Sequence, residues 1–213
     1  TGNELTKPGE ILLPGRIYES NSATLTAVLK HAGFDSSLVT VKDDFNSTKE
    51  TIGNAIDQND VVIITGGISV GDYDFVGRAL AELHVEEVFY KVKQKPGKPL
   101  FYGKKGDKSI FALPGNPAAV LTCYYMYVLT AIKSLIGIST PMLEEREVSI
   151  LHDFIKKGDR AHLLKAYITP EGVQVHAGQS SAMLSSFVGA NSLIYLSEED
   201  REIKKGDKVL VYI

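Results

Sequence analysis

A glycine-rich turn directly after a strand-like run is the feature that most constrains this chain. The segment from Val61 to Asp74 reads VVIITGGISVGDYD. Its first four residues are β-branched and uninterrupted, which is typical of a strand covered on both faces in a parallel sheet. Gly66, Gly67 and Gly71 then allow a tight turn and a close approach of the backbone to a ligand. Because ligands of such sheets bind beyond the carboxyl ends of the strands, the segment predicts a site for an anion there.

Two aspartates follow this turn and open the next predicted helix, Asp72 and Asp74. The apolar residues at helical spacing after them are Val76, Ala79, Leu80 and Leu83. A carboxylate at the start of a helix can cap its free N–H groups or hold a metal ion. The pattern leaves both roles open for each aspartate.

Helical and strand-like patterns alternate through the first two thirds of the chain. The predicted elements are helices over residues 20–32 and around 52–56, strands over Phe34–Val41 and Val61–Ile64, a hairpin around Gly103–Asp107, and a long helix from Asn116 towards Gly137. This βαβ rhythm predicts an α/β fold of three layers with a mostly parallel sheet.

The texture of the sequence changes beyond Pro141, where short strand-like runs are separated by turn signals. The runs are Val148–Leu151, Leu163–Ile168, Val173–Val175, Leu193–Leu196 and Val209–Ile213. Such a series predicts a small, barrel-like or sandwich all-β domain. A short polar connection near residues 138–143 marks the boundary. The expected domains are therefore residues 1–140 and 141–213.

Composition restricts the partners of the chain. Its 213 residues include 23 basic and 26 acidic ones, and the formal charge of −3 offers no general attraction to nucleic acid or to an anionic membrane. Any anion site must therefore be local. Cys123 is the only cysteine, so no disulfide forms within this sequence, and a reducing cytoplasm is expected. We find no apolar run of membrane-spanning length and no leader at the start, which predicts a soluble protein.

Several motifs occur in one order along nearly the whole chain. They are Thr1–Leu5, Gly15–Asn21, Lys42–Asp44, Gly66–Asp74, Lys95–Pro99 and Leu113–Pro117, followed by Gly178–Ser181 and Ala190–Asn191. Each is weak alone, since glycine and proline are common in turns, but the ordered set is specific. The set resembles the molybdopterin molybdenumtransferase family, MoeA, whose relatives include the gephyrin E domain. The resemblance covers the two C-terminal domains of that family and implies the molybdenum-cofactor biosynthesis fold.

The resemblance also implies a reaction. The family inserts molybdate into the dithiolene of adenylylated molybdopterin and releases AMP, with Mg²⁺ assisting. Carboxylates are needed to hold the cation, and cations to hold the oxyanions, because a phosphoanhydride and molybdate otherwise repel one another.

Site residues follow from matching positions in the family's motifs. The resemblance implies catalytic roles for Asp43, Asp74, Lys91 and Lys95, metal binding by Glu4, Asp43 and Asp74, and substrate contacts from Glu4, Thr65, Gly66, Gly67, Ser69, Gly71, Pro114 and Pro117. Pro114 and Pro117 match the prolines of the proposed molybdate pocket. They are also suited to shaping a turn from strand to helix.

The lysines admit a second interpretation. Lys91, Lys93 and Lys95 share parity on a predicted strand and hence one face, which is also how an exposed edge strand is protected against pairing with another chain. The pattern alone favours the interpretation of these lysines as protection of an edge strand. The family match favours a role in the site for Lys91 and Lys95, but not for Lys93.

Two other functions stay open. One is the molybdopterin adenylyltransferase, which is built on the same fold and makes the substrate of the reaction above. The other is a gephyrin-like scaffold, which an exposed apolar patch near the domain junction would favour. The resemblance further implies a homodimer, with the adenylyltransferase as a pathway partner.

The chain begins at Thr1, inside the family's first motif, whereas family members carry a substantial N-terminal part. In the family the catalytic cleft is shared with the N-terminal region of a partner subunit. We therefore expect ligand binding with reduced turnover from this sequence alone.

Overall fold

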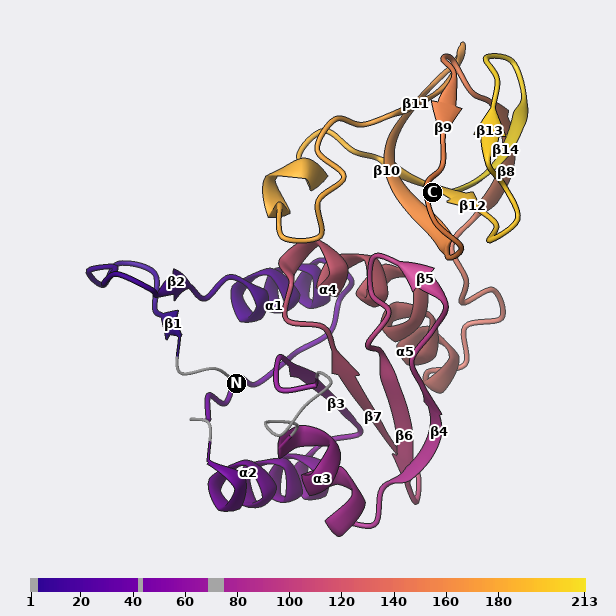
Figure 1. The fold of residues 1–213 in the computed structure, drawn as a ribbon. Coiled ribbons are helices and arrows are strands. Elements are labelled where there is room, and N and C mark those ends of the chain that lie inside the picture. Colours follow the sequence, from indigo (N-terminus) through magenta and orange to yellow (C-terminus); the bar gives the residue numbers. More distant parts are fainter. Residues whose placement is uncertain (1–3, 42–43, 69–74) are drawn as a thin grey trace. The chain divides into compact units, whose positions relative to one another are not determined.

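The computed structural model describes residues 4–41, 44–68 and 75–213. The chain packs into two compact units, Thr1–Lys91 with Pro99–Leu121, and Val92–Lys98 with Thr122–Ile213. The division falls inside a helix, and the expected boundary between residues 140 and 141 stays a prediction. Figure 1 shows the course of the chain, and each unit is described by itself.

The first unit is an α/β structure, as predicted. Its elements are β1 (Leu5–Thr6), β2 (Ile17–Tyr18), α1 (Asn21–His31), α2 (Phe45–Gln58), β3 (Val61–Thr65), α3 (Phe75–Glu82), β4 (Glu86–Tyr90), β6 (Phe101–Lys105) and β7 (Lys108–Leu113), and α4 (Pro117–Cys123) begins in it. The main sheet has the order β3-β7-β6-β4. Strands β3 and β7 pair in parallel, and the other two pairs are antiparallel, so the described sheet is mixed.

Helices α2 and α3 cover one face of this sheet (Figure 1). Ile52 and Ile56 of α2 are four residues apart, so they share one side of the helix, and both are buried. On β7, Ile110 and Ala112 point into the same core because alternate residues of a strand share a face. The hairpin of β6 and β7 predicted around the Gly103–Asp107 turn is confirmed, with Lys105 opposite Lys108.

The strand predicted over Phe34–Val41 is absent, since these residues lie in neither a helix nor a strand. Leu38 and Val39 are 61% and 64% exposed. The segment has an apolar pattern, but a strand also needs a neighbour for its backbone hydrogen bonds. In the part of the chain that the structure describes, nothing pairs with it.

The second unit is mostly β, as predicted. Its elements are β5 (Gln94–Lys95), the π-helix η1 (Tyr124–Val128), α5 (Leu129–Leu135), β8 (Glu145–Ser149), β9 (Phe154–Ile155), β10 (Ala161–Thr169), β11 (Gly172–Val175), the 3-10 helix η2 (Leu184–Phe187), β12 (Ser192–Leu196), β13 (Glu202–Ile203) and β14 (Lys208–Tyr212). The sheet runs β11-β10-β12-β14-β8, with β5 on β10. A single bridge between Ile150 and Val173 joins its two ends, which gives a barrel-like form without a continuous ladder at the seam.

Helix α4 continues through η1 into α5, which confirms the long helix predicted from Asn116. By length and composition Pro117–Leu135 could cross a membrane, with a mean hydropathy of 1.3, contrary to the expectation that no run of that length exists. However, 56% of the stretch is buried inside the structure. Ala118, Tyr124 and Val128 are fully buried. The stretch is apolar because it is a core helix.

Candidate functional site

The carboxyl ends of β3 and β7 bring two predicted site segments together. Thr65 is paired with Leu113 at the last register position of these parallel strands. The glycine-rich turn therefore starts beside the Leu113–Pro117 motif. A Cβ atom built on Gly115 would lie 3.9 Å from the Cα atom of Gly66. The sequence placed both segments at the ends of elements, and the structure shows that they are neighbours.

The backbone at this edge needs glycine. Gly66 and Gly67 have φ angles of 74° and 66°, in the left-handed region that side chains other than glycine rarely adopt. Such a turn can aim backbone N–H groups at an anion. Pro114 is buried, and Pro117 is half-buried at the start of α4, where a proline suits the turn that leads into a helix.

Asn21 ties a third motif to this edge. Its Nδ2 donates a 2.8 Å hydrogen bond to the carbonyl oxygen of Gly115, 94 residues away in sequence. Its Oδ1 is buried, and it has no hydrogen-bond partner among the residues that the structure describes. A carboxylate oxygen of Glu19 accepts a 2.8 Å hydrogen bond from the N–H of Ser22, so the first turn of α1 is capped without Asn21. The contact of Asn21 with Gly115 spans the fold, and no local pattern in the sequence indicates it.

Lys91 lies at the same edge of the sheet. Strand β4 is antiparallel to β6, and β6 is antiparallel to β7, so the carboxyl ends of β4, β7 and β3 all point the same way. The Nζ atom of Lys91 lies 4.6 Å from the centroid of the Tyr90 ring. The φ angle of Lys91 is 66°, and the chain therefore leaves the strand direction there.

The shared strand face predicted for the three lysines is wrong for this reason. β4 ends before Lys91, and β5 begins only at Gln94. Lys93 forms an ion pair with Glu198, and that contact raises the pKa of Lys93. Lys93 therefore has an electrostatic partner of its own.

Lys95 belongs to the second unit, where its Cα is paired with that of His162 on β10. Burial, together with the positive charges of Lys95, Lys156 and Arg160, lowers the pKa of His162 to about 4. These three cations come from two segments that are far apart in the chain, so no local pattern in the sequence indicates the group. Its electrostatic potential is suited to an anion.

Of the three carboxylates predicted to bind metal, the structure describes only that of Glu4. Glu4 is exposed, and its backbone carbonyl accepts a 2.9 Å hydrogen bond from the N–H of Ile17. Asp43 and Asp74 lie outside the described residues, as do Ser69 and Gly71. Among the residues that are described, no three His, Cys, Asp or Glu side chains gather as a metal ion would require. A fit to Mg²⁺ therefore rests on carboxylates that are not described.

Asp44, next to Asp43 in its motif, is the N-cap of α2. Its carboxylate accepts a 2.8 Å hydrogen bond from the N–H of Ser47, and this bond lowers the pKa of Asp44. The second aspartate of the motif thus has a structural role that its type and place could have indicated.

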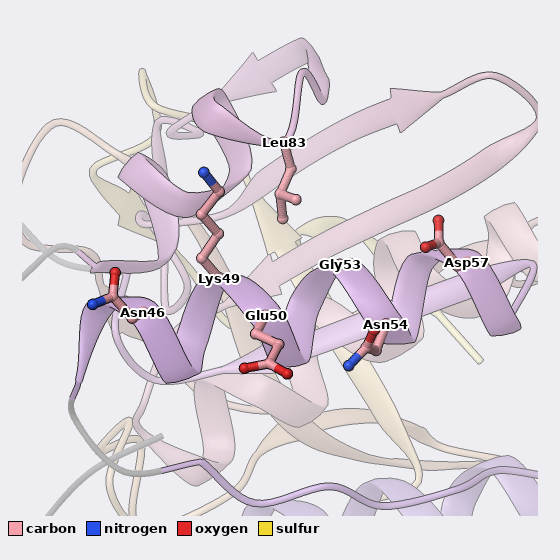
Figure 2. Close-up of a pocket in the computed structure, with 7 residues that line it drawn as sticks. All are labelled: Asn46, Lys49, Glu50, Gly53, Asn54, Asp57 and Leu83. Carbon is pink, nitrogen blue, oxygen red and sulfur yellow. The ribbon is translucent and has the colours of Figure 1, made fainter.

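A hollow of about 320 Å³ lies elsewhere, along the outer side of α2 (Figure 2). It is lined by Asn46, Lys49, Glu50, Gly53, Asn54, Asp57 and Leu83. The Lys49 ammonium is 2.9 Å from a Glu82 carboxylate, so its charge is already matched. None of the residues predicted for the site lines this hollow.

Known proteins resemble the chain over its whole length. It is 34% identical to the molybdenum cofactor synthesis protein cinnamon of Drosophila melanogaster, over 98% of this chain and 36% of that protein. It is 30% identical to a molybdopterin molybdenumtransferase of Staphylococcus epidermidis, over 100% of this chain and 52% of that protein. The chain thus spans about half the length of the latter relative, and less of the former.

The fold agrees with these relatives. A crystal structure of a molybdopterin biosynthesis MoeA protein from Pyrococcus horikosii matches with a TM-score of 0.83 and 26% identity, over 100% of this chain and 52% of that one. Residues 1–134 match the family described as a probable molybdopterin binding domain, and residues 147–213 match the MoeA C-terminal region, domain IV. The chain therefore belongs to the molybdopterin binding domain family and carries the MoeA C-terminal region after that domain, as its motifs indicated.

Proposed function

We propose that this chain is the ligand-binding half of a molybdopterin molybdenumtransferase. The whole enzyme would insert molybdate into adenylylated molybdopterin and release AMP, in a step that depends on Mg²⁺. The observation that carries the proposal is the close approach of the Gly66 turn and the Gly115 turn at the carboxyl ends of two parallel strands. Ligands of α/β sheets bind at such an edge.

The edge offers groups of the kind that this ligand needs. The glycine turn can supply backbone N–H groups to phosphate oxygens. The buried Oδ1 of Asn21, which none of the described residues contacts as a donor, can accept a hydrogen bond from the ligand. Lys91 adds a positive charge at the same edge, which favours an anionic ligand on a chain of net negative charge.

Mg²⁺ belongs to the proposal through Glu4, Asp43 and Asp74, and when bound it would neutralise phosphate and molybdate oxygens. The catalytic roles of Lys91 and Lys95, the substrate contacts of Thr65, Ser69, Gly71, Pro114 and Pro117, and the division into domains of residues 1–140 and 141–213 are likewise proposals. So are a homodimer, the adenylyltransferase as pathway partner, and a cytoplasmic location.

The adenylyltransferase alternative is less well supported, because the match over residues 147–213 is to a MoeA region. The scaffold alternative has one observation in its favour. Leu135, Ile136, Ile138 and Met142 are 52%, 60%, 41% and 63% exposed, near the predicted domain boundary. Exposed apolar residues that gather in one region can mark a protein contact.

Titration of the chain with adenylylated molybdopterin, followed by calorimetry with and without Mg²⁺, tests the proposal. We expect saturable binding that is tighter with Mg²⁺ and weaker after chelation. A scaffold without the enzymatic site would not bind this ligand, so a folded sample that shows no saturable binding would contradict the assignment.

A further inference from the structure

The turn from Lys95 to Lys98 combines exposed cations with a buried backbone. Lys95 and Lys98 are exposed, whereas Gly97 between them is buried with a φ angle of 88°. The N–H of Val92 donates a 3.0 Å hydrogen bond to the carbonyl oxygen of Lys98, which closes the segment into a loop. The position of the Lys95 ammonium group therefore depends on how firmly this loop is held.

Gln94 holds the loop from inside. Its side chain is 3% exposed, and its Nε2 donates a 3.0 Å hydrogen bond to the carbonyl oxygen of Pro96. Its Oε1 accepts a hydrogen bond from the hydroxyl of Tyr127. An amide donates from nitrogen and accepts at oxygen, so the Tyr127 bond fixes which way the Gln94 amide faces. The bond to Pro96 depends on that orientation.

The partners of Gln94 lie at a local irregularity of the long helix. The N–H of Leu129 donates to the carbonyl oxygen of Tyr124, five residues earlier, which is the bond of a π-turn. Such π-turns are rare and occur often at functional sites. Cys123 directly precedes this turn. Its Sγ atom is 3.9 Å from the Nε2 atom of Gln94 and also 3.9 Å from the carbonyl oxygen of Gly97.

These donors keep their protons at neutral pH. Burial raises the pKa of Tyr127 to about 12 and that of Cys123 to about 12. Deprotonation of these two groups therefore does not break the hydrogen bonds of the turn near neutral pH.

We propose that Tyr127 is a positioning residue, which acts through Gln94 to hold the Lys95–Lys98 turn so that the Lys95 ammonium meets an anionic ligand. The inference rests on the proposed function, since the anion is the adenylylated molybdopterin assigned above. Without the Tyr127 hydroxyl, the buried Oε1 of Gln94 loses its partner and the amide is free to turn. The ligand must then order the turn itself, and that ordering weakens binding.

Calorimetric titration with adenylylated molybdopterin at fixed salt provides the test. Tyr127→Phe removes only the hydroxyl, and we expect affinity to fall about tenfold, the equivalent of one lost hydrogen bond. Tyr125→Phe is the matched control, because Tyr125 lies on the same π-helix in edge-to-face contact with Tyr124. Its affinity should equal that of the unchanged protein.

A double-mutant cycle separates positioning from loss of structure. If Tyr127 acts through Lys95, adding Tyr127→Phe to Lys95→Ala changes affinity by less than about twofold. The salt dependence of binding gives a second readout. Loosening the Lys95 turn should reduce it as Lys95→Ala does, whereas a general loss of folded protein leaves the salt dependence unchanged.

The double variant Gln94→Met with Tyr127→Phe guards against misfolding. Replacing both buried partners by apolar groups of similar shape is close to neutral for stability. Its thermal midpoint should exceed that of Tyr127→Phe, while its affinity stays low because Pro96 remains unanchored. Recovery of affinity together with stability would overturn the inference.

Failure of the inference and failure of the proposed function give different results. If the unchanged protein does not bind the ligand, the proposed function fails and the inference falls with it. If it binds and Tyr127→Phe binds equally well, or loses as much affinity in the Lys95→Ala background as alone, only the inference fails.

Discussion

Gly66 and Gly115 approach one another across the ends of two parallel strands, so that a Cβ atom built on Gly115 would lie 3.9 Å from the Cα atom of Gly66. The two residues are 49 positions apart and belong to different motifs. Their close approach brings the glycine-rich turn beside the proline-flanked turn, and the first prediction concerns the space between them.

We expect Gly115→Ala to change the free energy of unfolding by less than about 0.5 kcal/mol, since Gly115 is exposed and its new methyl group meets an ordinary contact. The methyl group nevertheless narrows the space between the turns. Affinity for adenylylated molybdopterin should fall at least about fivefold by calorimetry. Gly53→Ala on α2 is the control, and it should leave affinity unchanged.

Gly66→Ala, unlike Gly115→Ala, should lower the free energy of unfolding. The φ angle of 74° places an alanine in the left-handed region, at a cost of about 1–2 kcal/mol. Urea unfolding should show a lower midpoint than for Gly115→Ala. Equal midpoints would mean that the turn adopts another conformation in solution.

Lys91 and Lys104 should differ in their effect on binding. Lys91 lies at the carboxyl edge that also carries the glycine turn, whereas Lys104 lies on β6 near the opposite end of the sheet. We expect Lys91→Gln to lower affinity about tenfold, through loss of a charge-assisted contact, and Lys104→Gln to leave it within error. Titrations at one salt concentration decide this. Equal losses would indicate a diffuse electrostatic attraction.

Asp44 should stabilise the protein as a helix cap, in a way that depends on pH. Its pKa is lowered in the folded state by the Ser47 N–H, so the stabilisation is complete above its unfolded value of 3.8 and is lost as pH falls below it. Asp44→Ala should lower the thermal midpoint at pH 7, while Asp44→Asn, which can still cap, should not. The advantage of Asp44 over alanine should shrink when both are measured near pH 3.

His162 should make the second unit sensitive to mild acid. Its folded pKa of about 4 is below the unfolded value of 6.5, so the folded state binds fewer protons and stability falls as pH decreases between these values. The slope approaches about 1.4 kcal/mol per pH unit. His162→Gln should remove this part of the acid dependence, measured by denaturant unfolding at pH 7 and pH 5. An unchanged pH profile would show that other groups cause the acid sensitivity.

Much of the fold followed from local patterns. The buried strand Val61–Ile64, the hairpin and the strands of the second unit were all marked by β-branched runs and turn residues, which act over a few positions. The segment Phe34–Val41 has a similar pattern and forms no strand, because pairing requires a neighbour that the pattern does not reveal.

The site shows the same limit. The order of the motifs predicted Gly66 and Pro114 as site residues. The parallel pairing of β3 with β7 explains why the segments that carry them are neighbours. The bond from Asn21 to Gly115 spans the fold and leaves no periodic trace. Lys165 is similar, since it is 2% exposed within β10 and its ammonium donates a 2.6 Å hydrogen bond to Ser186. A lysine in a strand is normally expected at the surface.

The chain passes from one compact unit to the other three times, after Lys91, after Lys98 and after Leu121. Two proteins joined by a linker would need a single passage, and could be separated by cutting it. Here a truncation at residue 140 would leave β5 without Ala161 and His162, its partners on β10. The excised first domain would keep the Lys95–Lys98 turn but lose the strand that pairs with β5. Any exchange of domains between relatives must therefore transfer the Val92–Lys98 segment together with the β region that holds it.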